Sequence, residues 1–70
     1  MVYEKVTLPV ARKIANLTQK GLADAVGVSE TTVINWEKGR TEPTVNQAIK
    51  IAEAGSRPLD SIIFLPKIAV

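Results

Sequence analysis

The sequence predicts a small all-α protein of five short helices, and three observations support this fold class. Apolar residues recur at helical spacing in several segments, and residue types that cap helices precede those segments. A hydrophobic fraction of 46%, nearly all of it aliphatic, provides one core in a chain of 70 residues. Residues 19–38 have the pattern of two helices joined by a glycine turn. We therefore expect a single domain over residues 1–70, with its core in about 8–64 and with flexible or dimerising ends.

The first helix is expected to begin near Leu8 and to carry Pro9 in its first turn, where the missing N–H costs nothing. Its core-facing positions are expected at i, i+4 and i+7, which are Val10, Ile14 and Leu17. Asn16 is expected to end this helix, because asparagine is the commonest non-glycine residue in a left-handed C-terminal position. Residues 1–7 are expected to form either a short edge strand or a loose arm.

Two helices that meet at Gly27 are predicted in the centre of the sequence. The first follows the cap residue Thr18 and is expected to bury Leu22, Ala23 and Val26. Gly27 can adopt a positive φ without steric cost, which suits a tight turn. Ser29 is a natural N-cap for the second helix.

The second of these helices is predicted to have an inner apolar side and an outer polar side. At about 100° per residue, the inner arc holds Val33, Trp36 and Glu37, and the outer arc holds Glu30, Thr31, Ile34, Asn35 and Lys38. Asparagine can bond adenine twice, glutamate can accept from cytosine, and an isoleucine or threonine methyl group can pack on thymine. The pattern therefore fits a helix-turn-helix. A plain solvated helix face is the alternative, against which the outward Ile34 counts.

Two further helices are expected after the loop that Gly39 opens. Thr44 and Gln47 form a capping box for the fourth helix. Its apolar stripe is expected at Val45, Ala48, Ile49 and Ala52. The run Gly55-Ser56-Arg57-Pro58 then breaks the chain, and a fifth helix is expected over about 59–64.

The segment LTQKGLADAVGVSETTVINWEKGRTEP resembles the helix-turn-helix domain shared by bacteriophage Cro and repressor proteins and by many small bacterial regulators. The matching residues are Leu17-Thr18-Gln19, Leu22-Ala23, Gly27-Val28-Ser29, Val33, Trp36-Glu37, Gly39 and Pro43. The resemblance implies a compact lambda-repressor-like fold and a sequence-specific, duplex-DNA-binding regulator, most like a small phage Cro-type repressor. The family commonly has Leu-Gly-Val-Ser in place of residues 55–58, so we expect a less buried turn there.

The resemblance also implies roles for individual side chains. Base contacts are expected from Glu30, Thr31, Ile34 and Asn35. Phosphate contacts are expected from Thr18, Gln19, Ser29, Thr32, Lys38 and Arg40. Helix capping alone would also explain Thr18 and Ser29, and favourable charge near a helix C-terminus would explain Lys38 and Arg40. The family pairs the residues that match Arg12 and Glu37, which implies a structural salt bridge and not a catalytic carboxylate.

Composition excludes several other classes of protein. The chain has neither cysteine nor histidine, so the usual zinc sites, disulfides and the commonest general base are absent, and we expect no metal, no cofactor and no enzymatic activity. The net charge of +2 is compatible with nucleic acid without demanding it. No apolar run approaches the roughly 18 residues of a membrane span, and the N-terminus lacks a signal-peptide pattern, so we expect a cytoplasmic protein.

The expected partner is double-stranded DNA, as a pseudo-palindromic operator bound by a homodimer. The half-site centres would lie about 34 Å apart. Dimerisation is expected to use apolar residues near the C-terminus, namely Ile62, Phe64, Leu65 and Ile68, although completion of the core would explain about half of that apolar end. A protein-interaction or antitoxin-type module with the same fold is the alternative function. The length suits an entire small regulator, and the N-terminal domain of a longer repressor would look similar.

Overall fold

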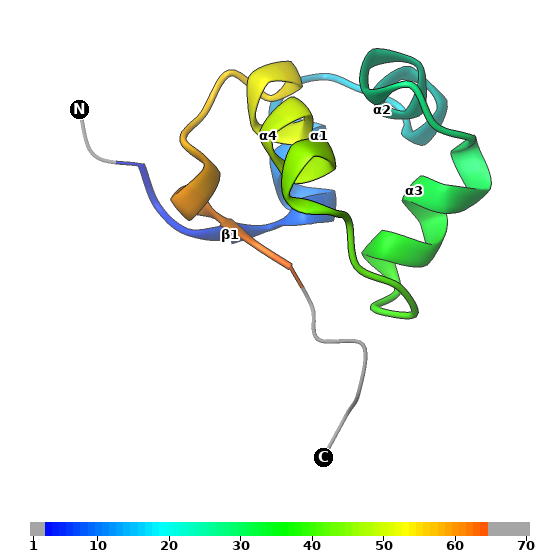
Figure 1. Ribbon diagram of the computed structural model, residues 1–70. Coiled ribbons are helices and arrows are strands. Elements are labelled where there is room, and N and C mark those ends of the chain that lie inside the picture. Colours follow the sequence, from blue (N-terminus) through cyan, green and yellow to red (C-terminus); the bar gives the residue numbers. More distant parts are fainter. Residues whose placement is uncertain (1–2, 65–70) are drawn as a thin grey trace.

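Short helices dominate the computed structural model, which describes residues 3–64 (Figure 1). The α-helices are α1 (Leu8–Ile14), α2 (Gln19–Val26), α3 (Glu30–Glu37) and α4 (Val45–Ala54). A 3-10 turn, η1 (Leu59–Ser61), follows α4, and two short strands, β1 (Val6–Thr7) and β2 (Ile62–Ile63), flank the helices in sequence. No helix among the described residues has the length and apolar character needed to cross a lipid bilayer.

The predicted fifth helix is wrong. Residues 59–61 form a single 3-10 turn, and the chain then extends as β2, which pairs in parallel with β1 through Val6↔Ile62 and Thr7↔Ile63. Two consecutive β-branched isoleucines favour an extended backbone, and the adjacent β1 offers them hydrogen-bonding partners. The part of the chain that the structure describes is therefore mostly helical with four α-helices, and the edge-strand alternative for the N-terminal segment is the correct one.

Two of the three core-facing positions predicted from the first helical stripe, Val10 and Ile14, are wrong, whereas Leu17 is half-buried and packs against the core. Val10 and Ile14 are 44% and 61% exposed, whereas the buried residues of this helix are Leu8 and Ala11. Because α1 ends at Ile14, Leu17 lies beyond it and cannot define a helical stripe with Val10 and Ile14. The inward side instead carries the small Ala11 and the half-buried Arg12.

The stripe predicted for α4 is half right. Ala48 and Ala52 are buried as predicted, whereas Val45 and Ile49 are 74% and 43% exposed and Ile51 is buried instead. Both sets fit helical spacing. The helix buries the set that contains Ile51, which is 2% exposed and lies in the main core.

The capping residues and left-handed positions agree with the sequence predictions. The Thr18 Oγ1 accepts the Gly21 N–H at 2.9 Å, and the Thr44 Oγ1 accepts the Gln47 N–H at 3.1 Å in a complete capping box. Asn16 has a φ of 61° and Gly27 a φ of 88°. These local features end α1 and α2 where the sequence indicates.

The core lies where α2 packs against both α3 and α4. It is formed by Leu8, Ala11, Leu22, Ala23, Val26, Val33, Trp36, Ile51, Ala52 and Ile62. A small apolar pocket of about 10 Å³ adjoins it, with Gly55 in its lining. This pocket lies next to the turn where the sequence predicts reduced burial.

Candidate nucleic-acid interface

The outer side of α3 is open to solvent along the arc predicted to contact bases. Glu30 and Thr31 are exposed, and Ile34 and Asn35 are half-buried. On the opposite side, Val33 is 0% and Trp36 4% exposed. The two buried residues fix the rotation of α3 about its axis, and this rotation presents the polar arc outward.

The turn before α3 sets the direction of that helix. The Gly27 and Val28 N–H groups both donate to the Ala23 carbonyl, at 2.8 and 3.0 Å, and so close the end of α2. The Ser29 Oγ accepts the Thr32 N–H at 3.2 Å and lies 2.9 Å from the Thr32 Oγ1. Capping is therefore a visible role of Ser29, and contact with phosphate is a separate prediction.

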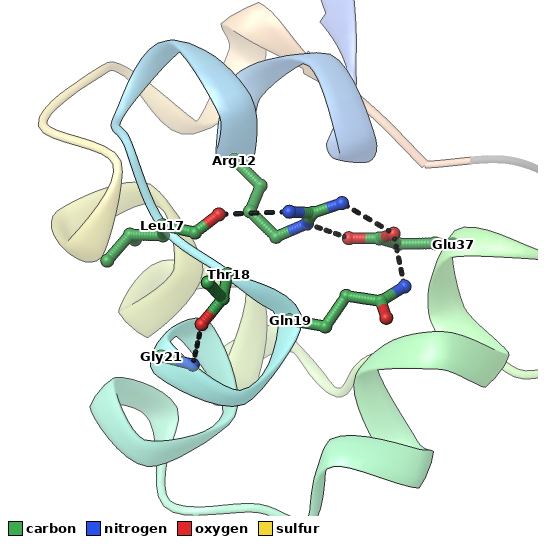
Figure 2. Close-up of polar contacts among 6 residues, drawn as sticks. All are labelled: Arg12, Leu17, Thr18, Gln19, Gly21 and Glu37. Carbon is green, nitrogen blue, oxygen red and sulfur yellow. Dashed lines mark hydrogen bonds and ion pairs between the residues drawn. The ribbon is translucent and has the colours of Figure 1, made fainter.

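A buried polar network joins α1, α2 and α3 (Figure 2). The Arg12 Nε donates to the Glu37 Oε2 at 2.6 Å, and the Arg12 Nη1 donates to the Leu17 carbonyl at 2.9 Å. The Gln19 Nε2 donates to the Glu37 Oε1 at 3.0 Å. The Arg12 and Glu37 side chains are only 12% and 7% exposed, so this ion pair is shielded from solvent.

The residues predicted to contact phosphate lie at helix ends. Thr18 and Gln19 begin α2, Ser29 and Thr32 begin α3, and Lys38 and Arg40 follow α3. Thr18, Ser29, Lys38 and Arg40 are exposed, while Gln19 and Thr32 are half-buried. All six therefore border the helix-turn-helix unit.

The contact between Gln19 and Glu37 is not predicted by the sequence analysis. The sequence nevertheless indicates that Glu37 needs partners, because it falls on the inner arc of α3 and a buried carboxylate requires them.

The contacts of Arg57 were missed as well. Its Nε donates to the Ser61 Oγ at 2.8 Å, its Nη2 donates to the Glu4 carbonyl at 2.6 Å, and its guanidinium lies 5.4 Å from the centre of the Tyr3 ring. The sequence could have indicated a special role for Arg57, because this chain has a cation at a turn where the family has an apolar residue.

The predicted dimerisation residues divide into three groups. Ile62 is 6% exposed and pairs with Val6 inside the same chain, so it completes the core, and its role in a dimer contact stays a prediction. Phe64 is half-buried against the core. Leu65 and Ile68 lie outside the described residues.

An apolar groove of about 290 Å³ opens between the start of α4 and the chain after it. It is lined by Pro43, Thr44, Val45, Ala48, Leu59, Ile62 and Phe64. Val45 and Leu59 in this lining are 74% and 38% exposed. Among residues 3–64, no three acidic side chains gather in a way that could hold a metal ion.

Comparison with known proteins identifies related sequences. The family described as "Helix-turn-helix" matches residues 10–62. An uncharacterized HTH-type transcriptional regulator of Methanocaldococcus jannaschii is 48% identical over 42 residues, which cover 60% of this chain and 64% of that protein. One from Methanothermobacter thermautotrophicus is 44% identical over 54 residues, or 77% of this chain and 78% of that protein. The cryptic phage CTXphi transcriptional repressor RstR of Vibrio cholerae is 37% identical over 51 residues, or 73% of this chain and 46% of RstR. The chain thus spans just under two thirds of the first relative and less than half of RstR.

Proposed function

Because the chain belongs to the XRE-type helix-turn-helix family of transcriptional regulators, we propose that it recognises a specific duplex-DNA operator by placing α3 in the major groove. Membership of this family makes it a DNA-binding regulator and not an enzyme. RstR is named as a phage repressor. A Cro-like repressing role is therefore our proposal for this chain.

The observation that carries the proposal is the two-sided character of α3. Its inner residues Val33 and Trp36 are buried, while Glu30, Thr31 and Asn35 stand on the open side. An exposed arc of this kind places several donors and acceptors where the edges of successive base pairs can meet them. Ile34, half-buried beside them, supplies an apolar contact for a thymine methyl group.

Phosphate contacts would flank these base contacts. Thr18, Gln19, Ser29 and Thr32 lie at the starts of α2 and α3, and Lys38 and Arg40 lie after α3. Contacts to phosphate on both sides of α3 would hold the helix in register along the groove.

Selection from a random duplex pool tests the proposal. We expect enrichment of one short motif by the wild-type protein and loss of that enrichment by the Glu30→Ala/Asn35→Ala double variant, which changes only the outer side of α3. A wild-type protein that enriches no sequence at modest salt would refute it.

We further propose that the protein binds DNA as a homodimer that uses the apolar groove at α4. The groove exposes Val45 at 74% and Leu59 at 38%, which supports this surface, because exposed apolar patches commonly mark interfaces. In sedimentation equilibrium, Val45→Lys should shift the mass toward monomer. The matched control Val10→Lys alters an exposed valine on α1 and should not. Equal behaviour of the two variants would count against this surface.

A protein-interaction or antitoxin-type module is the second candidate function, and the same groove is the observation that favours it. The random-pool selection separates the two functions, because an interaction module has no need for a preferred duplex sequence.

A further inference from the structure

We propose that Glu37 is a positioning residue for DNA binding. Held by Arg12, its carboxylate orients the side-chain amide of Gln19 so that an N–H of that amide, and not its oxygen, meets a DNA phosphate. This inference rests on the proposed function, and it gives the Arg12–Glu37 pair a role beyond the stability of the fold.

The geometry shows how firmly Glu37 is held. Its Oε2 receives the Arg12 Nε at 2.6 Å, and its Oε1 receives both the Arg12 Nη2 at 3.4 Å and the Gln19 Nε2 at 3.0 Å. Arg12 is itself fixed by its hydrogen bond to the Leu17 carbonyl. Figure 2 shows these contacts converging from α1, from the loop before α2, from the first residue of α2, and from α3. The Gln19 side chain is thus placed relative to the same helix that would contact bases.

The chemistry of the carboxylate sets the orientation of the amide. An ionised carboxylate only accepts hydrogen bonds, so the Gln19 amide must turn its nitrogen, and not its oxygen, toward Glu37. The amide nitrogen carries two hydrogens, and one of them stays available after the bond to Glu37. Phosphate oxygens are also acceptors, and they therefore require that remaining N–H.

Arg12 makes this arrangement compatible with DNA. An unpaired carboxylate close to a phosphate would repel it strongly, because two like charges that are shielded from water interact more strongly than two charges in water. The ion pair cancels the charge of Glu37, and the Gln19 amide that is bonded to this carboxylate is neutral. Gln19 is half-buried and not fully covered, which leaves it accessible from outside.

The test compares Glu37→Gln with Asp24→Asn. Each substitution removes one negative charge, so the change in net charge is the same. Asp24 is 69% exposed on α2 and forms only a 3.8 Å surface pair with Lys20. A glutamine at position 37 can donate as well as accept, so it no longer dictates how Gln19 is oriented.

We expect the Kd for the operator to be roughly tenfold higher for Glu37→Gln than for Asp24→Asn, the loss of one hydrogen bond to a charged group. Gln19→Ala should show the same loss, and the double variant Gln19→Ala/Glu37→Gln should show no further loss. Binding is measured at a temperature where circular dichroism shows all variants folded. Identical Kd values for folded Glu37→Gln and Asp24→Asn would overturn the inference.

A measurement on the wild-type protein covers the case in which Glu37→Gln does not fold. In NMR spectra of the wild-type protein, the side-chain NH2 signals of Gln19 should shift when operator DNA is added. Gln19 signals that do not respond to bound operator would overturn the inference while normal DNA binding leaves the proposed function intact. A wild-type protein that binds no duplex would overturn the proposed function and the inference together.

Discussion

Two glycines in different backbone conformations should respond oppositely to the same substitution. Gly55 has a φ of −84°, and a Cβ built there has its closest neighbour, the Ile51 carbonyl oxygen, at 3.5 Å, which is ordinary van der Waals contact. Gly27 has a φ of +88° and open space around its Cβ position. Alanine is therefore accommodated at position 55, whereas at position 27 it is strained by its backbone alone.

The magnitudes follow from the backbone. Gly55→Ala restricts the unfolded chain and should raise the free energy of unfolding by about 0.4–1 kcal/mol, with a further contribution where the new methyl group is shielded by Arg57 and the end of α4. Gly27→Ala places an L-residue in the left-handed region at a cost of about 1–2 kcal/mol, partly offset by the same entropic gain. Because the entropic gain is common to both, the two variants should differ by about 1–2 kcal/mol.

Urea unfolding followed by the fluorescence of the single tryptophan measures both variants. At an unchanged m-value, the midpoint should rise for Gly55→Ala and fall for Gly27→Ala. A stability change of the same sign in both variants would refute the reasoning, because it would mean that φ does not decide the outcome.

Three further substitutions and one control probe the interface and its support. Asn35→Ala should weaken operator binding by about 1–3 kcal/mol and relax preference at one base pair; an equal loss on operator and random DNA, measured by fluorescence anisotropy, would argue against a base contact. Arg40→Ala should weaken both kinds of site and reduce the salt slope by about one, and an unchanged slope would remove it from the phosphate contacts. Arg12→Ala leaves the shielded Glu37 carboxylate unpaired and should lower the free energy of unfolding by about 3 kcal/mol. Lys20→Ala, which breaks only the exposed pair, should cost less than about 1 kcal/mol, and similar losses in these two variants would contradict the assigned burial.

The parts of the fold that depend on local chemistry were predictable from the sequence. Thr18, Ser29 and Thr44 cap helices through hydrogen bonds to residues three positions on, so their own neighbourhood decides the outcome. The left-handed backbone at Asn16 and Gly27 is local in the same sense. The inner and outer sides of α3 followed from the marked contrast between Trp36 and its polar neighbours.

The parts that failed depend on distant residues. In α4, the stripe with Val45 and Ile49 and the stripe with Ile51 are both helical patterns, and only the packing against α2 selects the second. Residues 59–63 do not form the predicted α-helix, because β1, more than fifty positions earlier, pairs with Ile62 and Ile63. The bond between Gln19 and Glu37 likewise requires α2 and α3 to be placed before it can be seen.

The pairing of β1 with β2 brings the two ends of the domain together, and forming this closure costs conformational entropy. It joins Val6 to Ile62, and Arg57 reinforces it by binding the Glu4 carbonyl. In Figure 1 this closure lies on the other side of α1 and α4 from α3. Because the entropy lost in forming a loop grows with its length, the closure demands more ordering of the chain than the short link between α2 and α3. We therefore expect hydrogen exchange to be faster in β1 and β2 than in α2 and α3.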